Sequence, residues 1–213
     1  MKAVIFDLDG VLVDTAKYHY LAWKKLAAEL GVNLTEKENE RLKGVSRMDS
    51  LKIILSLGGL TFSEAEMNRL ADRKNSWFVE YIDQMKPEEI FDGVFPLLNA
   101  LREAGVSIAL ASSSKNAAAV LKNLLLENTF DTVVDGTMIK ESKPDPEIFL
   151  KAADNLGVAP NECIVVEDAE AGVEAARRAG MKAVGIGHTE QLGEAELVVD
   201  HISKLSYNRL KSL

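Results

Sequence analysis

Five short runs of apolar residues recur along the chain, and their composition and length favour strands over helices. They are rich in Val and Ile, do not alternate with polar residues, and cover residues 3–6, 107–111, 132–134, 163–166 and 183–186. Strands that are buried on both faces have this pattern, which is typical of parallel sheets. The runs therefore predict a parallel sheet that is covered by helices on both sides.

Helical patterns lie between these runs and end at glycines. Apolar residues share one helix face before Gly105, Gly157 and Gly180, at positions where a left-handed residue commonly ends a helix. Strand and helix thus alternate along much of the chain. This order predicts the α/β class, with a doubly wound, Rossmann-like parallel-sheet core domain.

The interval from residue 15 to residue 87 has a different character. It contains no convincing strand, and helical patterns cover residues 16–30, 47–57 and 63–81. We expect an all-helical domain, residues 15–87, inserted into an α/β core domain that consists of residues 1–14 and 88–213 and carries the catalytic site. The linkers should lie near residues 14–15 and 86–92.

Composition and charge narrow the possible partners and location. Asp and Glu total 33 against 25 Lys and Arg, a net charge of -8, and an acidic chain repels a nucleic-acid backbone. The single cysteine, Cys163, excludes an intrachain disulfide and fits a reducing compartment. No apolar run approaches the ~20 residues of a membrane span, and the first run is too short for a signal peptide. We expect a cytoplasmic protein with no nucleic-acid or membrane partner, in which Cys163 is inert core.

Polar side chains follow the predicted strands at the points where they end. Residues 7–10 (Asp-Leu-Asp-Gly) follow the first strand, 112–116 (Ser-Ser-Ser-Lys-Asn) the second, and 167–168 (Glu-Asp) the strand at 163–166. Lys143 lies in a loop just before a helix. Because the carboxyl ends of parallel strands converge on one crevice where ligands bind, we expect these side chains to meet at one edge of the sheet.

The acidic pairs suggest a metal site. Two carboxylates at one strand end, Asp7 and Asp9, repel unless a cation lies between them or one takes a proton. Glu167 and Asp168 would add oxygen ligands of the kind that Mg²⁺ prefers. A lone Asp is more often a strand end or a turn cap, but two acidic pairs after buried runs make that interpretation the weaker one.

Ser112 and Lys143 make a plausible phosphate site, because a hydroxyl donates a hydrogen bond and an ammonium group supplies positive charge. Either residue alone is common turn material. In the helical insert, His19 and Trp23 continue an apolar stripe, so periodicity alone favours a packing role for both. Arg47 could clamp a second phosphate through paired N–H donors, although a solvated surface arginine is equally compatible with the composition.

These residues resemble a known family. Residues 7–11, Ser112, Lys143-Pro144 and 167–168 resemble, in order and spacing, the four motifs of the haloacid dehalogenase-like superfamily, and the insert resembles its helical cap. More narrowly, residues 15–19, 42–47 and 111–116 are similar to the β-phosphoglucomutase branch. The stretch from 43 to 47 is much more specific to that branch than the core motifs, which many phosphatases share.

The resemblance implies a role for each matching position. Asp7 would be the nucleophile and Asp9 the general acid/base, with Thr15 at the hinge. Mg²⁺ would be bound by Asp7, the main-chain carbonyl of Asp9, Glu167 and Asp168, and the transferring phosphate by Ser112, Ser113 and Lys143. Arg47, Ser114 and Asn116 would hold the other phosphate, and the full set of substrate-binding positions would be His19, Trp23, Lys43, Gly44, Val45, Arg47, Lys74, Ser114, Lys115 and Asn116.

The resemblance also implies an activity, the interconversion of β-D-glucose 1-phosphate and D-glucose 6-phosphate. The enzyme would form an aspartyl phosphate, with glucose 1,6-bisphosphate as intermediate and activator. The partner would be a small sugar phosphate and the chain a monomer. Two alternatives stay open: a Mg²⁺-dependent sugar-phosphate phosphatase of the same superfamily, and a non-catalytic receiver protein that is phosphorylated on aspartate. A phosphonate-cleaving relative would not need an acid/base at Asp9.

Overall fold

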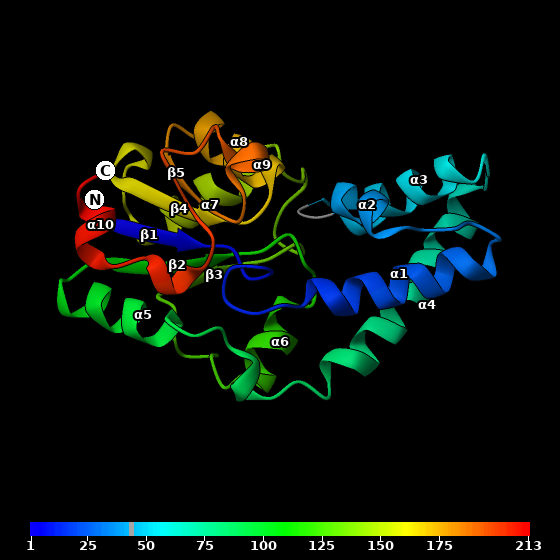
Figure 1. Cartoon of the computed structure of the whole chain (residues 1–213), viewed down its shortest axis with the longest axis horizontal. Coiled ribbons are helices and arrows are strands. Elements are labelled where there is room, and N and C mark those ends of the chain that lie inside the picture. Colours follow the sequence, from blue (N-terminus) through cyan, green and yellow to red (C-terminus); the bar gives the residue numbers. More distant parts are fainter. Residues whose placement is uncertain (43–44) are drawn as a thin grey trace.

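The computed structural model describes residues 1–42 and 45–213. Two lobes make up the molecule, a sheet lobe with helices on both faces and a helical lobe at one end of it (Figure 1). Both chain termini lie on the sheet lobe, far from the helical lobe. Two of the candidate residues, Lys43 and Gly44, lie outside the described residues.

The sheet has six strands, which confirms the predicted α/β class. In spatial order they are β3 (Thr132–Val134), β2 (Ser107–Ala111), β1 (Ala3–Phe6), β4 (Cys163–Glu167), β5 (Lys182–Ile186) and β6 (Leu197–Val199). Every neighbouring pair is parallel. The edge strand β6, with the apolar sequence Leu-Val-Val, is a sixth strand that the sequence analysis does not predict. β1 and β4 lie side by side in the middle of the sheet, and so do their carboxyl ends.

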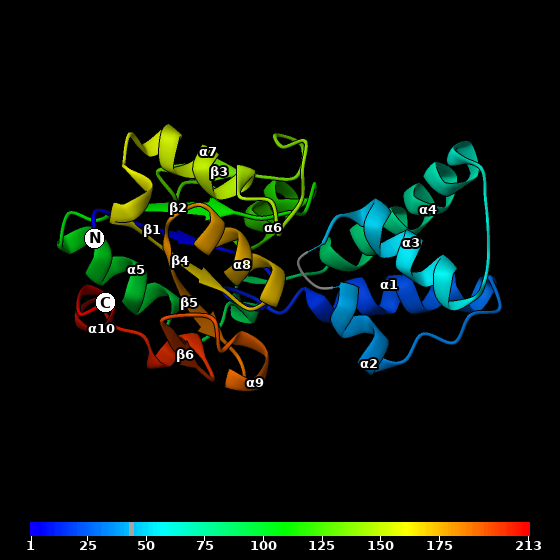
Figure 2. The same ribbon diagram turned by 90° about the horizontal axis from the view of Figure 1, so that it is seen from above.

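Alternate residues of the strands supply two separate apolar cores, one on each face of the sheet. Val4 and Phe6 belong to the core that contains residues of α5 (Val94–Glu103), α6 (Ala117–Asn123) and α10 (Tyr207–Lys211). Ala3 and Ile5 belong to the core on the other face. That face is covered by α7 (Glu147–Leu156) and α8 (Glu170–Arg178), with α9 (Thr189–Leu192) beside β5 and β6 (Figure 2). Both faces of the sheet are therefore covered, as the continuous apolar runs predicted.

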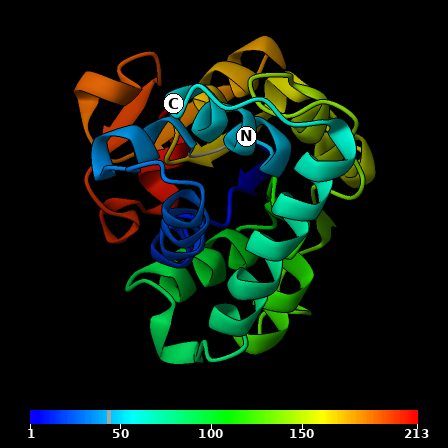
Figure 3. The ribbon, with the colours of Figure 1, turned by 90° about the vertical axis from the view of Figure 1, so that its right-hand side faces the viewer.

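The helical lobe has an apolar core of its own. It consists of α1 (Ala16–Glu29), α2 (Glu36–Asn39), α3 (Arg47–Leu57) and α4 (Glu64–Ile82), and Figure 3 looks onto it. Trp23, Leu26 and Leu51 are among the buried residues of this core. The side chain of Ser46 accepts the N–H of Asp49 at the start of α3. Such caps satisfy N–H groups that have no partner within the helix.

The two chain segments that connect the lobes lie side by side. Val13 forms an antiparallel bridge with Ile90, and the N–H of Phe91 donates to the carbonyl of Leu12 at 2.9 Å. We propose that the inserted domain comprises residues 15–87 and the core domain residues 1–14 and 88–213, because both chain crossings then fall at this paired segment.

Cys163, at the start of β4, is 1 % exposed. Burial, together with the negative charge of the nearby Glu162, raises the pKa of its thiol to about 11. A thiol with a raised pKa is unreactive at neutral pH, which agrees with the expected role in the core. None of the helices in the described part of the chain has the length and apolar character needed to span a bilayer.

Candidate active site

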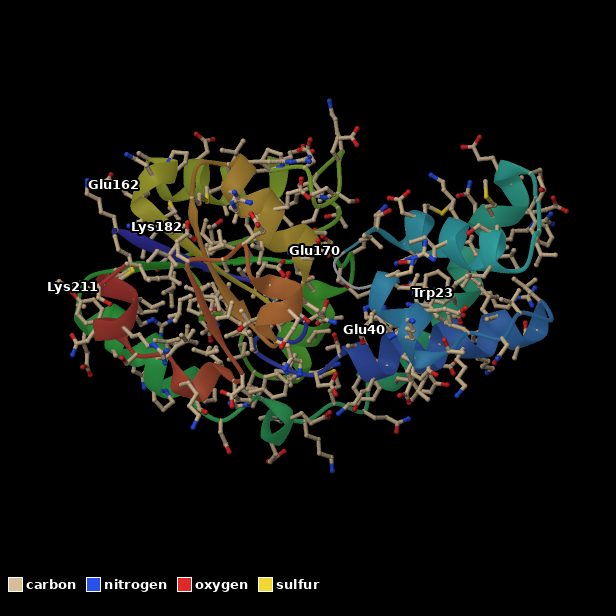
Figure 4. The ribbon with its side chains drawn as sticks, turned by 45° about the horizontal axis from the view of Figure 1, so that its top comes forward. Trp23, Glu40, Glu162, Glu170, Lys182 and Lys211 are labelled. Carbon is tan, nitrogen blue, oxygen red and sulfur yellow. The ribbon has the colours of Figure 1, made fainter. Side chains whose placement is uncertain are left out.

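A cavity of about 540 Å³ lies between the two lobes at the carboxyl ends of the central strands. Figure 4 labels Trp23 in the helical lobe and Glu170, at the start of α8, in the sheet lobe. Residues of both lobes line the cavity. The sequence-predicted residues among them are Asp7, Asp9, His19, Trp23, Val45, Arg47, Lys74, Ser113, Ser114, Lys115, Asn116 and Asp168.

Behind the cavity wall, Lys143 joins the ends of two strands through its ammonium group. Its Nζ donates to Asp7 Oδ1 at 2.6 Å and also to Glu167 Oε1. All three residues are at most 5 % exposed. Burial alone would lower the pKa of Lys143, but the two carboxylates raise it above its ordinary value, so the ammonium group stays charged. Burial raises the pKa of Asp7 to about 6, against the opposing effect of Lys143.

Asp9 lies two residues beyond Asp7 in the turn that leaves β1. Its N–H donates to Asp7 Oδ2 at 2.9 Å, and its own Oδ1 accepts from the hydroxyl of Thr15. Burial, followed by the negative charge of Asp7, raises the pKa of Asp9 to about 8. The two neighbouring carboxylates therefore differ in proton affinity, which is the arrangement that separates a nucleophile from an acid.

Gly10 allows this turn to approach the end of β4. Its φ is +76°, and a Cβ built on it would lie 2.1 Å from Asp168 Oδ2. Any larger residue at this position would collide with that carboxylate. Asp168 can lie next to the turn only because Gly10 has no side chain.

The donor set at this point fits a hard cation. Asp7 and Asp168 both line the cavity, and oxygen ligands of this kind suit Mg²⁺. Glu167 has other partners: its Oε1 accepts from Lys143, and its Oε2 accepts the N–H groups of Asp168 and Ala169, both at 2.9 Å. Within residues 1–42 and 45–213 no three acidic, imidazole or thiol side chains form a ready-made metal cluster. A cation would thus rely on two carboxylates and main-chain oxygen, with Glu167 holding the β4 end in place.

The serine loop after β2 is ordered by its own hydroxyl groups. Ser112 is fully buried and its Oγ accepts the N–H of Ser114 at 3.1 Å, while Ser114 Oγ accepts the N–H of Asn116 at 3.2 Å. A hydroxyl that accepts from the main chain keeps its hydrogen for another acceptor. Lys143 also reaches this loop, since its Nζ lies 3.4 Å from the carbonyl oxygen of Ala111. The expected phosphate donors are therefore grouped at the end of β2.

On the helical-lobe side of the cavity, His19 and Lys74 form a pair. Lys74 Nζ lies 2.7 Å from His19 Nδ1, and the His19 ring stacks on Phe78 with 3.9 Å between ring centroids. Lys74 Nζ is also 4.6 Å from the ring of Trp23. Burial lowers the pKa of both His19 and Lys74 well below their ordinary values, and the charge of Arg47 lowers them further. Helix periodicity indicated packing for His19 and Trp23, but both also line the cavity.

Arg47 begins α3, and its Nη1 lies 3.8 Å from Asp72 Oδ1. Asp72 is one of the cavity residues that the sequence did not reveal. Asn75, which does not line the cavity, was also missed; its Oδ1 accepts from Asn116 Nδ2 at 2.8 Å. Both lie on α4, where the sequence shows a helix but no motif. The partner of each becomes known only from the contacts between elements.

Comparisons with known proteins agree with this geometry. A model of the haloacid dehalogenase-like hydrolases matches residues 1–180. A β-phosphoglucomutase of Bacillus subtilis is 45 % identical over 212 residues, which cover 99 % of this chain and 94 % of that protein. A Thermotoga maritima protein named phosphorylated carbohydrates phosphatase is 35 % identical, over 92 % of this chain and 90 % of its own.

Among solved structures, a β-phosphoglucomutase from Clostridium difficile superimposes with a TM-score of 0.96 and 44 % sequence identity. The match covers 100 % of this chain and 96 % of that one. The sequence motifs, the arrangement of Asp7, Lys143 and Asp168 at the sheet edge, and these similarities lead to one conclusion. The chain belongs to the haloacid dehalogenase-like hydrolase family.

Proposed function

We propose that this protein is a phosphoryl-transfer isomerase that interconverts β-D-glucose 1-phosphate and D-glucose 6-phosphate. One observation carries the proposal: a single cavity has Asp7 in its sheet-lobe wall and Arg47 in its helical-lobe wall. A sugar with a phosphate at each end suits such a cavity. The two β-phosphoglucomutases to which the chain is similar along nearly its whole length support the same substrate class.

The reaction starts from the aspartyl phosphate on Asp7. In the first half-reaction the free hydroxyl of the substrate sugar phosphate attacks that phosphorus, Asp9 takes the hydroxyl proton, and the bond between phosphorus and Asp7 breaks, which gives glucose 1,6-bisphosphate. In the second half-reaction an oxygen of Asp7 bonds to the phosphorus at the other end of the turned bisphosphate while the bond to the sugar oxygen breaks, and Asp9 gives its proton to the departing sugar oxygen. The raised pKa of Asp9 suits a residue that must hold a proton near neutral pH.

Lys143, Ser112 and Ser113 would hold the transferring phosphoryl group. Family membership implies Mg²⁺, which Asp7, Asp168 and the main-chain carbonyl of Asp9 would hold. When bound, the ion supplies positive charge that reduces repulsion between a carboxylate and a phosphate. Glu167 would act by holding Lys143 and the start of the loop after β4.

The second phosphate requires its own site, because direct transfer across the sugar is geometrically impossible in one step. Glucose 1,6-bisphosphate would form, turn around and return its other phosphate to Asp7, so it serves as intermediate and activator. Arg47, Ser114 and Asn116 would bind the phosphate that is not reacting, with Lys115 nearby. The residues that would face the sugar or support Asp9 are His19, Trp23, Lys43, Gly44, Val45 and Lys74, and Thr15 would lie at the hinge.

A sugar-phosphate phosphatase with the same core chemistry is the rival function, and the Thermotoga maritima relative is named as one. The two activities differ in the acceptor, which is water for a phosphatase and a sugar hydroxyl for a mutase. A closed helical lobe that excludes water favours the second. We further infer that the enzyme works as a monomer in the cytoplasm, because one chain supplies both ends of the cavity and its substrates are intracellular metabolites.

A coupled assay tests the proposal. The protein is mixed with β-D-glucose 1-phosphate, Mg²⁺ and a trace of glucose 1,6-bisphosphate, and glucose 6-phosphate and inorganic phosphate are measured in parallel. We expect glucose 6-phosphate to form much faster than phosphate is released. Phosphate release without glucose 6-phosphate would indicate the phosphatase, and stable phosphorylation of Asp7 with no turnover would indicate the receiver protein.

A further inference from the structure

Two side-chain amides of the core helix α6 donate to the long helix α4 of the helical lobe. Asn116, which precedes α6, donates from Nδ2 to Asn75 Oδ1 at 2.8 Å, and Asn123, the last residue of α6, donates from Nδ2 to the carbonyl of Ile82 at 2.9 Å. Positions seven apart lie on nearly the same side of a helix, so both bonds belong to one seam where α4 meets α6 (Figure 1).

The two bonds differ in their relation to the cavity. Asn116 lines it, next to Ser114 and Lys115, and its main-chain N–H is already held by Ser114 Oγ. Asn123 and Ile82 lie at the other end of the same seam. The Asn116–Asn75 bond therefore involves a cavity residue. The Asn123–Ile82 bond joins the same two helices but involves no cavity residue, so it can serve as a control.

The partner of Asn116 decides what its side chain can offer a ligand. A carboxamide can rotate to exchange its donor and acceptor ends, and the acceptor end would repel an anion. In the structure Asn75 presents its Oδ1 atom to the NH₂ group of Asn116, and with Asn75 in this orientation the Asn116 rotamer whose Nδ2 faces α4 is favoured. The second N–H of that group then remains for a phosphate oxygen.

We propose that Asn75 is a positioning residue for the non-reacting phosphate, acting through the orientation of the Asn116 amide. The inference rests on the proposed function, in which Asn116 binds that phosphate. Because Asn75 belongs to the helical lobe and Asn116 to the sheet lobe, this phosphate site reaches its donor arrangement only when α4 is in place beside α6. Correct placement of the helical lobe and recognition of the second phosphate would thus depend on the same contact.

A double-mutant cycle tests this role. Asn75→Ala should raise KM for β-D-glucose 1-phosphate about three- to tenfold, the usual effect of losing one hydrogen bond, with a smaller change in kcat. Asn116→Ala should do at least as much, and Asn75→Ala should add nothing further once Asn116 is already alanine. Asn123→Ala removes the other bond of the seam and should leave KM within about twofold of wild type.

Three results would overturn the inference: an unchanged KM in Asn75→Ala, independent and additive effects of Asn75→Ala and Asn116→Ala, or an equal rise in KM in Asn123→Ala. The last would mean that the seam only holds the lobes together. Thermal melting curves verify that each variant is folded. Calorimetric binding of glucose 6-phosphate to the same variants separates failure of the inference about Asn75 from failure of the proposed function. If the wild type binds the sugar phosphate without converting it, the binding constants still decide the role of Asn75.

Discussion

Each lobe buries one lysine, and the pKa values of the two lysines are shifted in opposite directions. Lys143 of the sheet lobe is 2 % exposed and Lys74 of the helical lobe 1 % exposed. Lys143 is paired with Asp7 and Glu167, which raise its pKa. Lys74 is paired with the imidazole of His19 among aromatic rings, and its pKa is lowered.

The difference shows that partners, rather than burial, decide whether a buried amine is charged. The sheet lobe presents an assembled set of charges, because neighbouring strand ends bring carboxylates and lysine together. The helical lobe presents a buried amine with a reduced proton affinity, and an arginine whose acidic partner is exposed. We infer that the sheet lobe supplies the phosphoryl chemistry and the helical lobe recognises the substrate.

The largest effect should come from Asp7, the proposed nucleophile of the sheet lobe. Asp7→Asn keeps the size of the side chain but removes the charged oxygen, so glucose 6-phosphate formation should fall by more than about 10⁴-fold. The exposed Asp154 on α7 provides a control, since Asp154→Asn makes the same chemical change away from the cavity. Turnover by Asp7→Asn within tenfold of wild type would remove Asp7 from its assigned role.

Replacing each lysine with methionine tests the comparison directly. Lys143→Met leaves two buried carboxylates without their cation and should lower the free energy of unfolding by about 3–5 kcal/mol. Lys74→Met should leave stability unchanged or raise it, because methionine suits the rings of Trp23 and Phe78. Chemical denaturation of both variants at pH 7 measures the difference.

The same pair predicts a pH dependence. Below pH ~10.5 the lysine side chain carries a proton in the unfolded protein. The lowered pKa of Lys74 means that the folded protein holds this proton less tightly. The free energy of unfolding of the wild type should therefore increase as the pH is raised towards ~10.5. Lys74→Met lacks this contribution. Any stability advantage of Lys74→Met at pH 7 should therefore shrink as pH is raised, and an advantage that grows would show that Lys74 is charged in the folded protein.

A smaller effect is expected from Arg47→Ala in the helical lobe. Loss of charge-assisted hydrogen bonds to the second phosphate should raise KM about 10- to 100-fold and slow transfer to sugar more than phosphate release. Arg73→Ala is the matched control, because Arg73 forms an exposed ion pair with Glu29 in the same lobe. Equal losses of mutase and phosphatase activity in Arg47→Ala would contradict the division of roles between the lobes.

The smallest effect concerns the counter-ion of Arg47. Asp72 is largely exposed and 3.8 Å from the guanidinium group, so the pair is worth about 1 kcal/mol at most. A phosphate that binds Arg47 competes with this carboxylate. Asp72→Asn should therefore lower KM by about two- to fivefold, whereas Asp83→Asn, at the end of the same helix, should not. Steady-state kinetics at low ionic strength would detect the change.

Much of the architecture could be predicted from sequence. Five of the six strands are apolar runs, and the predicted helices over 16–30, 47–57 and 63–81 end within a residue of α1, α3 and α4. The grouping of Asp7, Ser112 and Asp168 at one edge of the sheet could also be predicted, because these residues directly follow strand ends. The short elements β6, α2, α6, α9 and α10 were not predicted, although the equally short strand β3 was.

Local sequence determined the strands, the helices and the chemical groups at the strand ends, because period, turn residues and capping act over a few neighbouring positions. Tertiary structure alone decided the partners: Lys143 with two carboxylates 136 and 24 residues away, Lys74 with His19, and Asn116 with Asn75. The pKa of a buried group and the orientation of an amide depend on what lies within a few ångströms in space, and no short-range pattern along the chain contains that information.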